Sequence, residues 1–90
     1  MIVRMNVTQT WYNNMMTALE KSKDNYTQSD AYKIEALQNN IKQYSKMEAD
    51  GNITMSLADS NIKKIVSYMS SALTSGIVSP IYSSELMEKY

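Results

Sequence analysis

The sequence predicts an all-α protein, a small bundle of about four helices with a long antiparallel central helical hairpin. Three observations favour this class. The 90 residues include only 2 Gly and 1 Pro, so the strongest helix breakers are rare. Helix-forming residues fill the middle of the chain, and apolar residues recur there every three or four positions. Strand-type alternation is not sustained over any useful length. Because a chain this short holds one core, we expect residues 1–90 to form a single helical domain.

The first helix is predicted from near Asn6 or Thr8 to about Ser22. Asn6 and Gln9, three residues apart, make a capping pair at its start. The polar segment 23–28 lacks an apolar period, so we expect a loop there. One apolar stripe follows the helix and consists of Val7, Trp11, Met15, Ala18 and Leu19.

A second helix of about twenty residues is predicted to start at Ser29, whose hydroxyl can accept a hydrogen bond from a free backbone amide. Asp30 follows where the helix dipole favours an acid. Its apolar face needs a partner and consists of Ala31, Ile34, Leu37, Ile41 and Tyr44.

Two junctions share the pattern Gly-x-aliphatic-hydroxyl, at 51–54 and again at 76–79. A glycine can close one helix, and the hydroxyl residue can cap the next. We therefore expect the central hairpin to hinge at Asp50 and Gly51. A third helix then runs from Thr54 to about Thr74, and a short fourth helix from Pro80 to Lys89. The buried side of the third helix is predicted to hold Leu57, Ala58, Ile62, Ile65, Val66, Met69 and Leu73.

Composition excludes several classes of function. Nine basic and nine acidic residues give zero net charge, which does not favour nucleic acid as a partner. The absence of Cys and His removes the usual zinc, iron–sulfur and copper ligands. The segment 48–54 resembles the middle of a calcium loop, but Lys46 and Leu57 stand where calcium needs oxygen ligands. We therefore expect no metal and no cofactor.

No stretch approaches the 18 or more apolar residues of a membrane span. We therefore expect a protein without a transmembrane segment. A cysteine-free chain fits the cytoplasm and fits equally a protein exported by a bacterial secretion apparatus.

A helix-turn-helix DNA-binding regulator is one alternative. Ala72, Gly76 and Ser79 approximate the turn of that motif and precede the short fourth helix. The spacing is one residue too long, and Glu85 and Glu88 would repel phosphate from the recognition helix.

A second alternative comes from Gln38, Ile41, Tyr44 and Ser45 after the capped start at Ser29. This segment resembles the second helix of type III secretion needle subunits, which are small cysteine-free helical hairpins. The resemblance covers about residues 29–45 and implies a needle-like subunit or its escort. It assigns no role to any residue.

Tyrosine is the residue type that most suggests a binding surface. The chain has 7 Tyr, 1 Trp and no Phe, and rings outside a core are enriched where proteins contact each other. The alternative is that Tyr replaces Phe at half-buried positions. The predicted partner-binding residues, which fall off the main apolar stripes, are Tyr12, Tyr26, Tyr32 and Tyr68.

These observations predict a non-enzymatic helical protein–protein interaction module of bacterial or phage origin. It would act as an inhibitor, a chaperone or an assembly subunit, and its partner would be another protein or a second copy of itself. The acid pairs Glu48 with Asp50 and Glu85 with Glu88 lack an apolar pocket that would raise a pKa. We therefore expect no catalytic residues.

Overall fold

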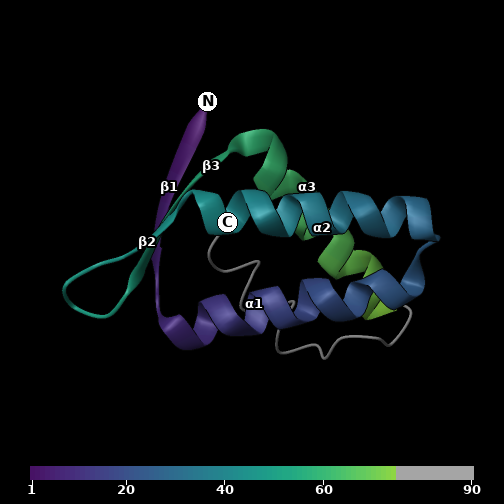
Figure 1. The fold of residues 1–90 in the computed structure, drawn as a ribbon, viewed down its shortest axis with the longest axis horizontal. Coiled ribbons are helices and arrows are strands. Elements are labelled where there is room, and N and C mark those ends of the chain that lie inside the picture. Colours follow the sequence, from purple (N-terminus) through teal and green to yellow (C-terminus); the bar gives the residue numbers. More distant parts are fainter. Residues whose placement is uncertain (75–90) are drawn as a thin grey trace.

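The computed structural model describes residues 1–74 and has an α+β fold. Three antiparallel strands form one sheet in the order β1-β3-β2 at one end of the three helices (Figure 1). The prediction of an all-α bundle of four helices is therefore wrong. The predicted fourth helix and the junction at 76–79 lie outside the described residues. In chain order the elements are β1 (Ile2–Val7), α1 (Gln9–Ser22), the 3₁₀ turn η1 (Lys23–Asn25), α2 (Gln28–Gln43), β2 (Ser45–Met47), β3 (Ile53–Ala58) and α3 (Asp59–Thr74).

Strand β1 was missed by the sequence analysis. Val3, Met5 and Val7 alternate with exposed residues, and the buried fraction is highest at Val7, which is the period-two pattern of a strand with one covered face. Every residue of β1 pairs with β3 in an unbroken antiparallel register. Thr8 then caps α1, because its Oγ1 accepts a hydrogen bond from the Trp11 backbone amide at 3.1 Å. The first helix lies where the sequence predicts it, but its cap is Thr8 and not Asn6.

The predicted helical hairpin at Asp50 and Gly51 is instead a β-hairpin. Helix α2 ends at Gln43, and the chain turns back between β2 and β3. The Gly51 amide donates to the Glu48 carbonyl at 3.0 Å, and Gly51 has φ 87°. An Asp-Gly pair with glycine in the left-handed region is a common hairpin turn. The same conformation closes helices, so the dipeptide alone does not distinguish the two structures.

Strand β3 occupies the predicted first turn of the third helix. Ile53, Met55 and Leu57 are buried and alternate with half-buried residues, so this segment follows period two. Helix α3 begins at Asp59, and Thr54 pairs with Asn6 across the sheet and does not cap a helix. The second helix starts close to its predicted position, with Thr27 as the cap that accepts from the Asp30 amide.

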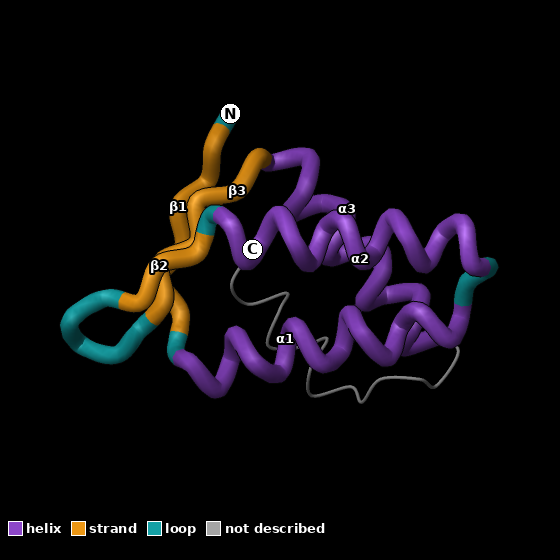
Figure 2. Tube along the Cα trace, in the orientation of Figure 1, coloured by secondary structure: helices purple, strands orange, loops and turns teal. Residues whose placement is uncertain are grey.

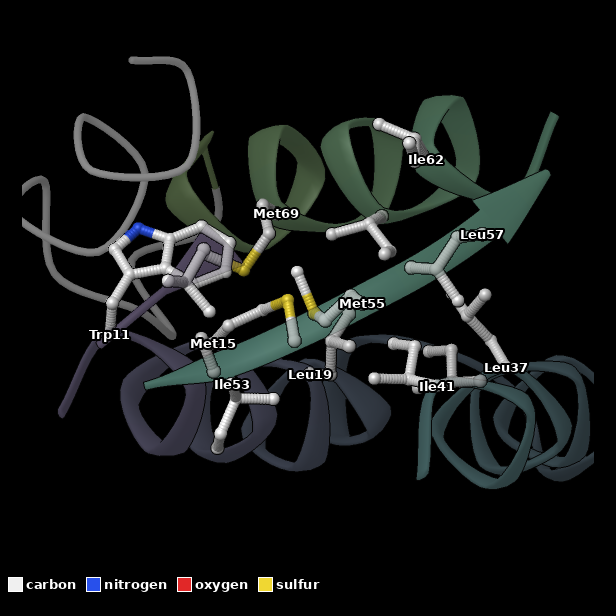
Figure 3. Packing of buried hydrophobic residues seen from close by; sticks show 14 residues of the cluster. Trp11, Met15, Leu19, Leu37, Ile41, Ile53, Met55, Leu57, Ile62 and Met69 are labelled. Atoms are coloured by element: carbon white, nitrogen blue, oxygen red, sulfur yellow. The ribbon is translucent and has the colours of Figure 1, made fainter. Parts of the chain in front are cut away.

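The core lies between one face of the sheet and the three helices (Figures 2 and 3). None of the described helices is long and apolar enough to cross a membrane. Each helix contributes residues three or four positions apart, and β3 contributes every second residue. The buried apolar residues are Val7, Trp11, Met15, Ala18, Leu19, Ile34, Leu37, Ile41, Ile53, Met55, Leu57, Ile62, Ile65 and Met69.

Candidate interaction surface

The face of the sheet turned away from the core carries every second residue of the three strands. Tyr44 belongs to this face because the Ser56 amide donates to its carbonyl at 3.0 Å, which extends the β2–β3 register by one pair. We call this outer face the sheet surface. Its residues are Ile2, Arg4, Asn6, Tyr44, Lys46, Thr54, Ser56 and Ala58.

The hairpin end of the sheet surface is polar. The Asn6 side chain donates to Thr54 Oγ1 at 3.2 Å and accepts from Asn52 Nδ2 at 3.1 Å. These two bonds fix the position of the Asn6 carboxamide between Thr54 and Asn52. Arg4 stands opposite Ser56 and Lys46 opposite Thr54, and within residues 1–74 neither cation has an ion-pair partner. Two cations without an ion-pair partner in the described part of the chain therefore flank a row of hydroxyl and amide groups.

The other end of the sheet surface is apolar. Ile2 is 64% exposed and Tyr44 is 51% exposed. Between them lies a hollow of about 300 Å³, because Ala58 stands opposite Ile2 and its methyl group is too short to fill the space. The hollow continues to α2 and α3, where Asn61 Nδ2 donates to Asn40 Oδ1 at 3.0 Å. Exposed apolar side chains beside a concave site with polar groups are typical of a surface that binds another molecule.

The four predicted tyrosines do not form one surface. The rings of Tyr26 and Tyr68 contact each other edge to face, with centroids 5.4 Å apart, and both pack against the core. Tyr12 is also partly buried, beside β2. Tyr32 lies on α2 and is 61% exposed. The other three tyrosines are half-buried, and a partner-binding role stays a prediction for all four.

Tyr44 is the exposed ring that the sequence analysis missed. It was assigned to the buried stripe of the second helix, three residues after Ile41. In the structure it follows the last residue of α2 and has φ −108°, outside the helical region. The sequence carries one signal for this change, which is the short run Ser45–Met47 directly before the Asp-Gly turn.

Tyr68→Ala is expected to lower the free energy of unfolding by about 1–3 kcal/mol, because it removes both a ring contact and packing against the core. Tyr32→Ala makes the same chemical change at an exposed ring and should change the free energy of unfolding by less than about 0.5 kcal/mol. Urea unfolding followed by circular dichroism measures both. Equal losses in the two variants would contradict the placement of these rings.

A second hollow, of about 500 Å³, lies between α1 and α2 and is lined mainly by residues with charged or amide side chains. Lys23 Nζ lies 2.6 Å from Glu20 Oε2. This hydrogen bond, helped by one from Gln38, outweighs partial desolvation and holds the pKa of the Glu20 carboxyl below its usual value. Glu20 is therefore ionised at neutral pH and acts as an acceptor. Mixed charges without an exposed apolar side chain make this groove a weaker candidate than the sheet surface.

Among residues 1–74, no three side chains of the metal-binding types lie together. Of the acid pairs considered from sequence, Glu48 and Asp50 both lie in the hairpin turn, where Asp50 Oδ1 accepts from the Asn52 amide at 2.9 Å. Glu85 and Glu88 lie outside the described residues. No protein-family model, curated protein or solved structure matches this chain. Function is therefore inferred from the geometry of the sheet surface.

Proposed function

We propose that this protein is a non-enzymatic protein–protein interaction module that binds its partner through the apolar end of the sheet surface. In this role it serves as an inhibitor, a chaperone or an assembly subunit. The observation that supports the proposal is the pair of exposed apolar side chains, Ile2 and Tyr44, on either side of a hollow on an open sheet face. Aromatic side chains near the centre of such a patch contribute much of the binding energy in protein interfaces.

The surroundings of the hollow indicate what the partner presents. Ala58 and Ile2 offer apolar contact, and Ser56 and the Asn40–Asn61 pair offer hydrogen-bonding groups at the rim. Arg4 and Lys46 lie farther along the same face without acidic neighbours opposite them. A protein segment with an apolar anchor for the hollow and a carboxylate near Arg4 matches this pattern.

The test compares two exposed tyrosines of similar exposure. Tagged protein with Tyr44→Ala, with Tyr32→Ala and without substitution is used to capture proteins from its source cells, and quantitative mass spectrometry compares the three sets. We expect proteins bound by the unaltered chain to be depleted at least tenfold by Tyr44→Ala, equivalent to about 1.4 kcal/mol, and retained by Tyr32→Ala.

Circular dichroism of the two variants controls for folding, since both side chains lie outside the core. Equal capture by all three proteins would contradict the proposal. Loss with Tyr32→Ala alone would also contradict it and would instead assign binding to Tyr32, one of the four tyrosines predicted from the sequence.

A further inference from the structure

Strand β1 lies at an edge of the sheet, and among the described residues no strand pairs with its outer side. The Asp59 amide donates to the Met1 carbonyl at 3.0 Å, so in the one-to-one register the odd-numbered residues of β1 direct their backbone groups toward β3. The backbone N–H and C=O groups of Ile2, Arg4 and Asn6 therefore point away from the sheet. Figure 1 shows the N-terminal half of β1 standing clear of the helices.

This edge lacks the features by which sheets usually prevent further pairing. It has no proline, its register contains no bulge, and Arg4 is its one charged residue. Its inward side chains are also less well covered than those of the central strand. Val3 and Met5 are partly buried, whereas Leu57 and Met55 opposite them are each 1% exposed. A further strand beside β1 would cover the exposed sides of Val3 and Met5.

We propose that a second copy of this chain pairs with β1 in antiparallel orientation, so that the two sheets join into one of six strands. Two registers that overlap most of β1 bring the outward backbone groups of the two copies together and keep the apolar side chains on one face. One places Arg4 opposite Arg4 of the second copy, which juxtaposes like charges.

The other register avoids that repulsion and fixes the proposed geometry. Arg4 stands opposite Asn6 of the second copy, Val3 opposite Val7, and Met5 opposite Met5. Every pair within residues 3–7 joins apolar with apolar or a cation with a neutral amide, so this part of the strand is complementary to itself in this direction. The zero net charge of the chain adds no long-range repulsion between copies. Because paired residues share a face, the two sheet surfaces become one continuous surface.

The chain has no cysteine, so single cysteine substitutions report the register directly. Met5 pairs with its own copy at a non-hydrogen-bonded position, where Cα atoms lie about 4.5 Å apart, within the range of a disulfide. Full-length Met5→Cys protein is therefore expected to form a covalent dimer on mild oxidation with copper phenanthroline. Asn6→Cys keeps the Arg4 charge and places its two thiols about two residues out of register, beyond the ~7 Å limit for Cα atoms, so it should form no covalent dimer.

Sedimentation equilibrium of the unaltered chain gives a second measurement. We expect a mass above 10.3 kDa that rises with concentration, and the monomer mass for Arg4→Pro, whose lost amide points outward. Covalent dimer with Asn6→Cys, equal oxidation of both cysteine variants, or a constant monomer mass for the unaltered chain would each overturn the proposal. Tyr44 lies on the strand side opposite β1, so Tyr44→Ala leaves this assembly intact. The partner-binding proposal can therefore fail separately.

Discussion

Ile41→Asp is expected to leave the chain unfolded at room temperature. Ile41 is 0% exposed in the last turns of α2, and Figure 3 shows it beside Leu37 in the core. An aspartate there would place a carboxylate among apolar side chains without a partner, at a cost of about 4 kcal/mol or more. Since a domain of this size has a stability of only about 5–15 kcal/mol and the cavity left by the isoleucine adds to the loss, little folded protein should remain. Far-UV circular dichroism and amide chemical-shift dispersion measure the effect.

Ile2→Asp is the matched control, because it makes the same change at an isoleucine that is 64% exposed. Its carboxylate stays in water, so we expect the helical signal to be retained and stability to change by about 1 kcal/mol or less. A folded Ile41→Asp protein, or equal unfolding of both variants, would show that the core is misplaced.

The two long helices before residue 44 could be predicted because their evidence is local. Trp11, Met15 and Leu19 recur at helical spacing, and so do Ile34, Leu37 and Ile41. All six are buried in the structure. The boundaries at the first loop were also close, since the predicted loop at 23–28 corresponds to η1 and the cap of α2. The predicted end of the second helix was wrong, because α2 ends at Gln43 and the chain continues into β2.

The third helix was predicted too long because two periods overlap at Leu57. Counted backward, Leu57 continues the alternation of Ile53 and Met55. Toward the C-terminus, Leu57 instead joins the apolar stripe of the predicted third helix, which includes Ile62 and Ile65. In the structure it belongs to β3, and α3 begins two residues later. A short strand directly before a helix gives too few residues to separate period two from period 3.6.

Strand pairing between β1 and β3 could not be read from the sequence because it is not local. Val3 pairs with Leu57 and Val7 with Ile53, and no residue near β1 reports a partner that far along the chain. The sheet surface could not be predicted from the sequence for the same reason. Its apolar end requires Ile2 and Ala58 to meet, and the sequence analysis assigned no structure to the first and a buried helix position to the second.

Met5→Pro and Arg4→Pro are expected to differ sharply, and this difference tests the strand itself. The Met5 amide points toward β3 and the Arg4 amide away from it, as the bond from Asp59 to the Met1 carbonyl and the unbroken register establish. Proline at position 5 removes a bond within the sheet and leaves a carbonyl of the central strand unpaired. We expect Met5→Pro to lower the free energy of unfolding by about 3 kcal/mol or more.

Proline at position 4 removes an amide that has no partner within the described chain, and edge strands tolerate it there. Arg4→Pro should therefore cost about 1 kcal/mol or less when both proteins are compared at one low concentration, where association between copies contributes little. Met5→Ala separates the loss of the methionine side chain from the loss of the backbone bond. Urea unfolding of all three variants provides the measurement. If residues 1–5 formed no strand, the two proline variants would have equal stability. If β1 is a strand, Met5→Pro lowers the free energy of unfolding by more than Arg4→Pro does.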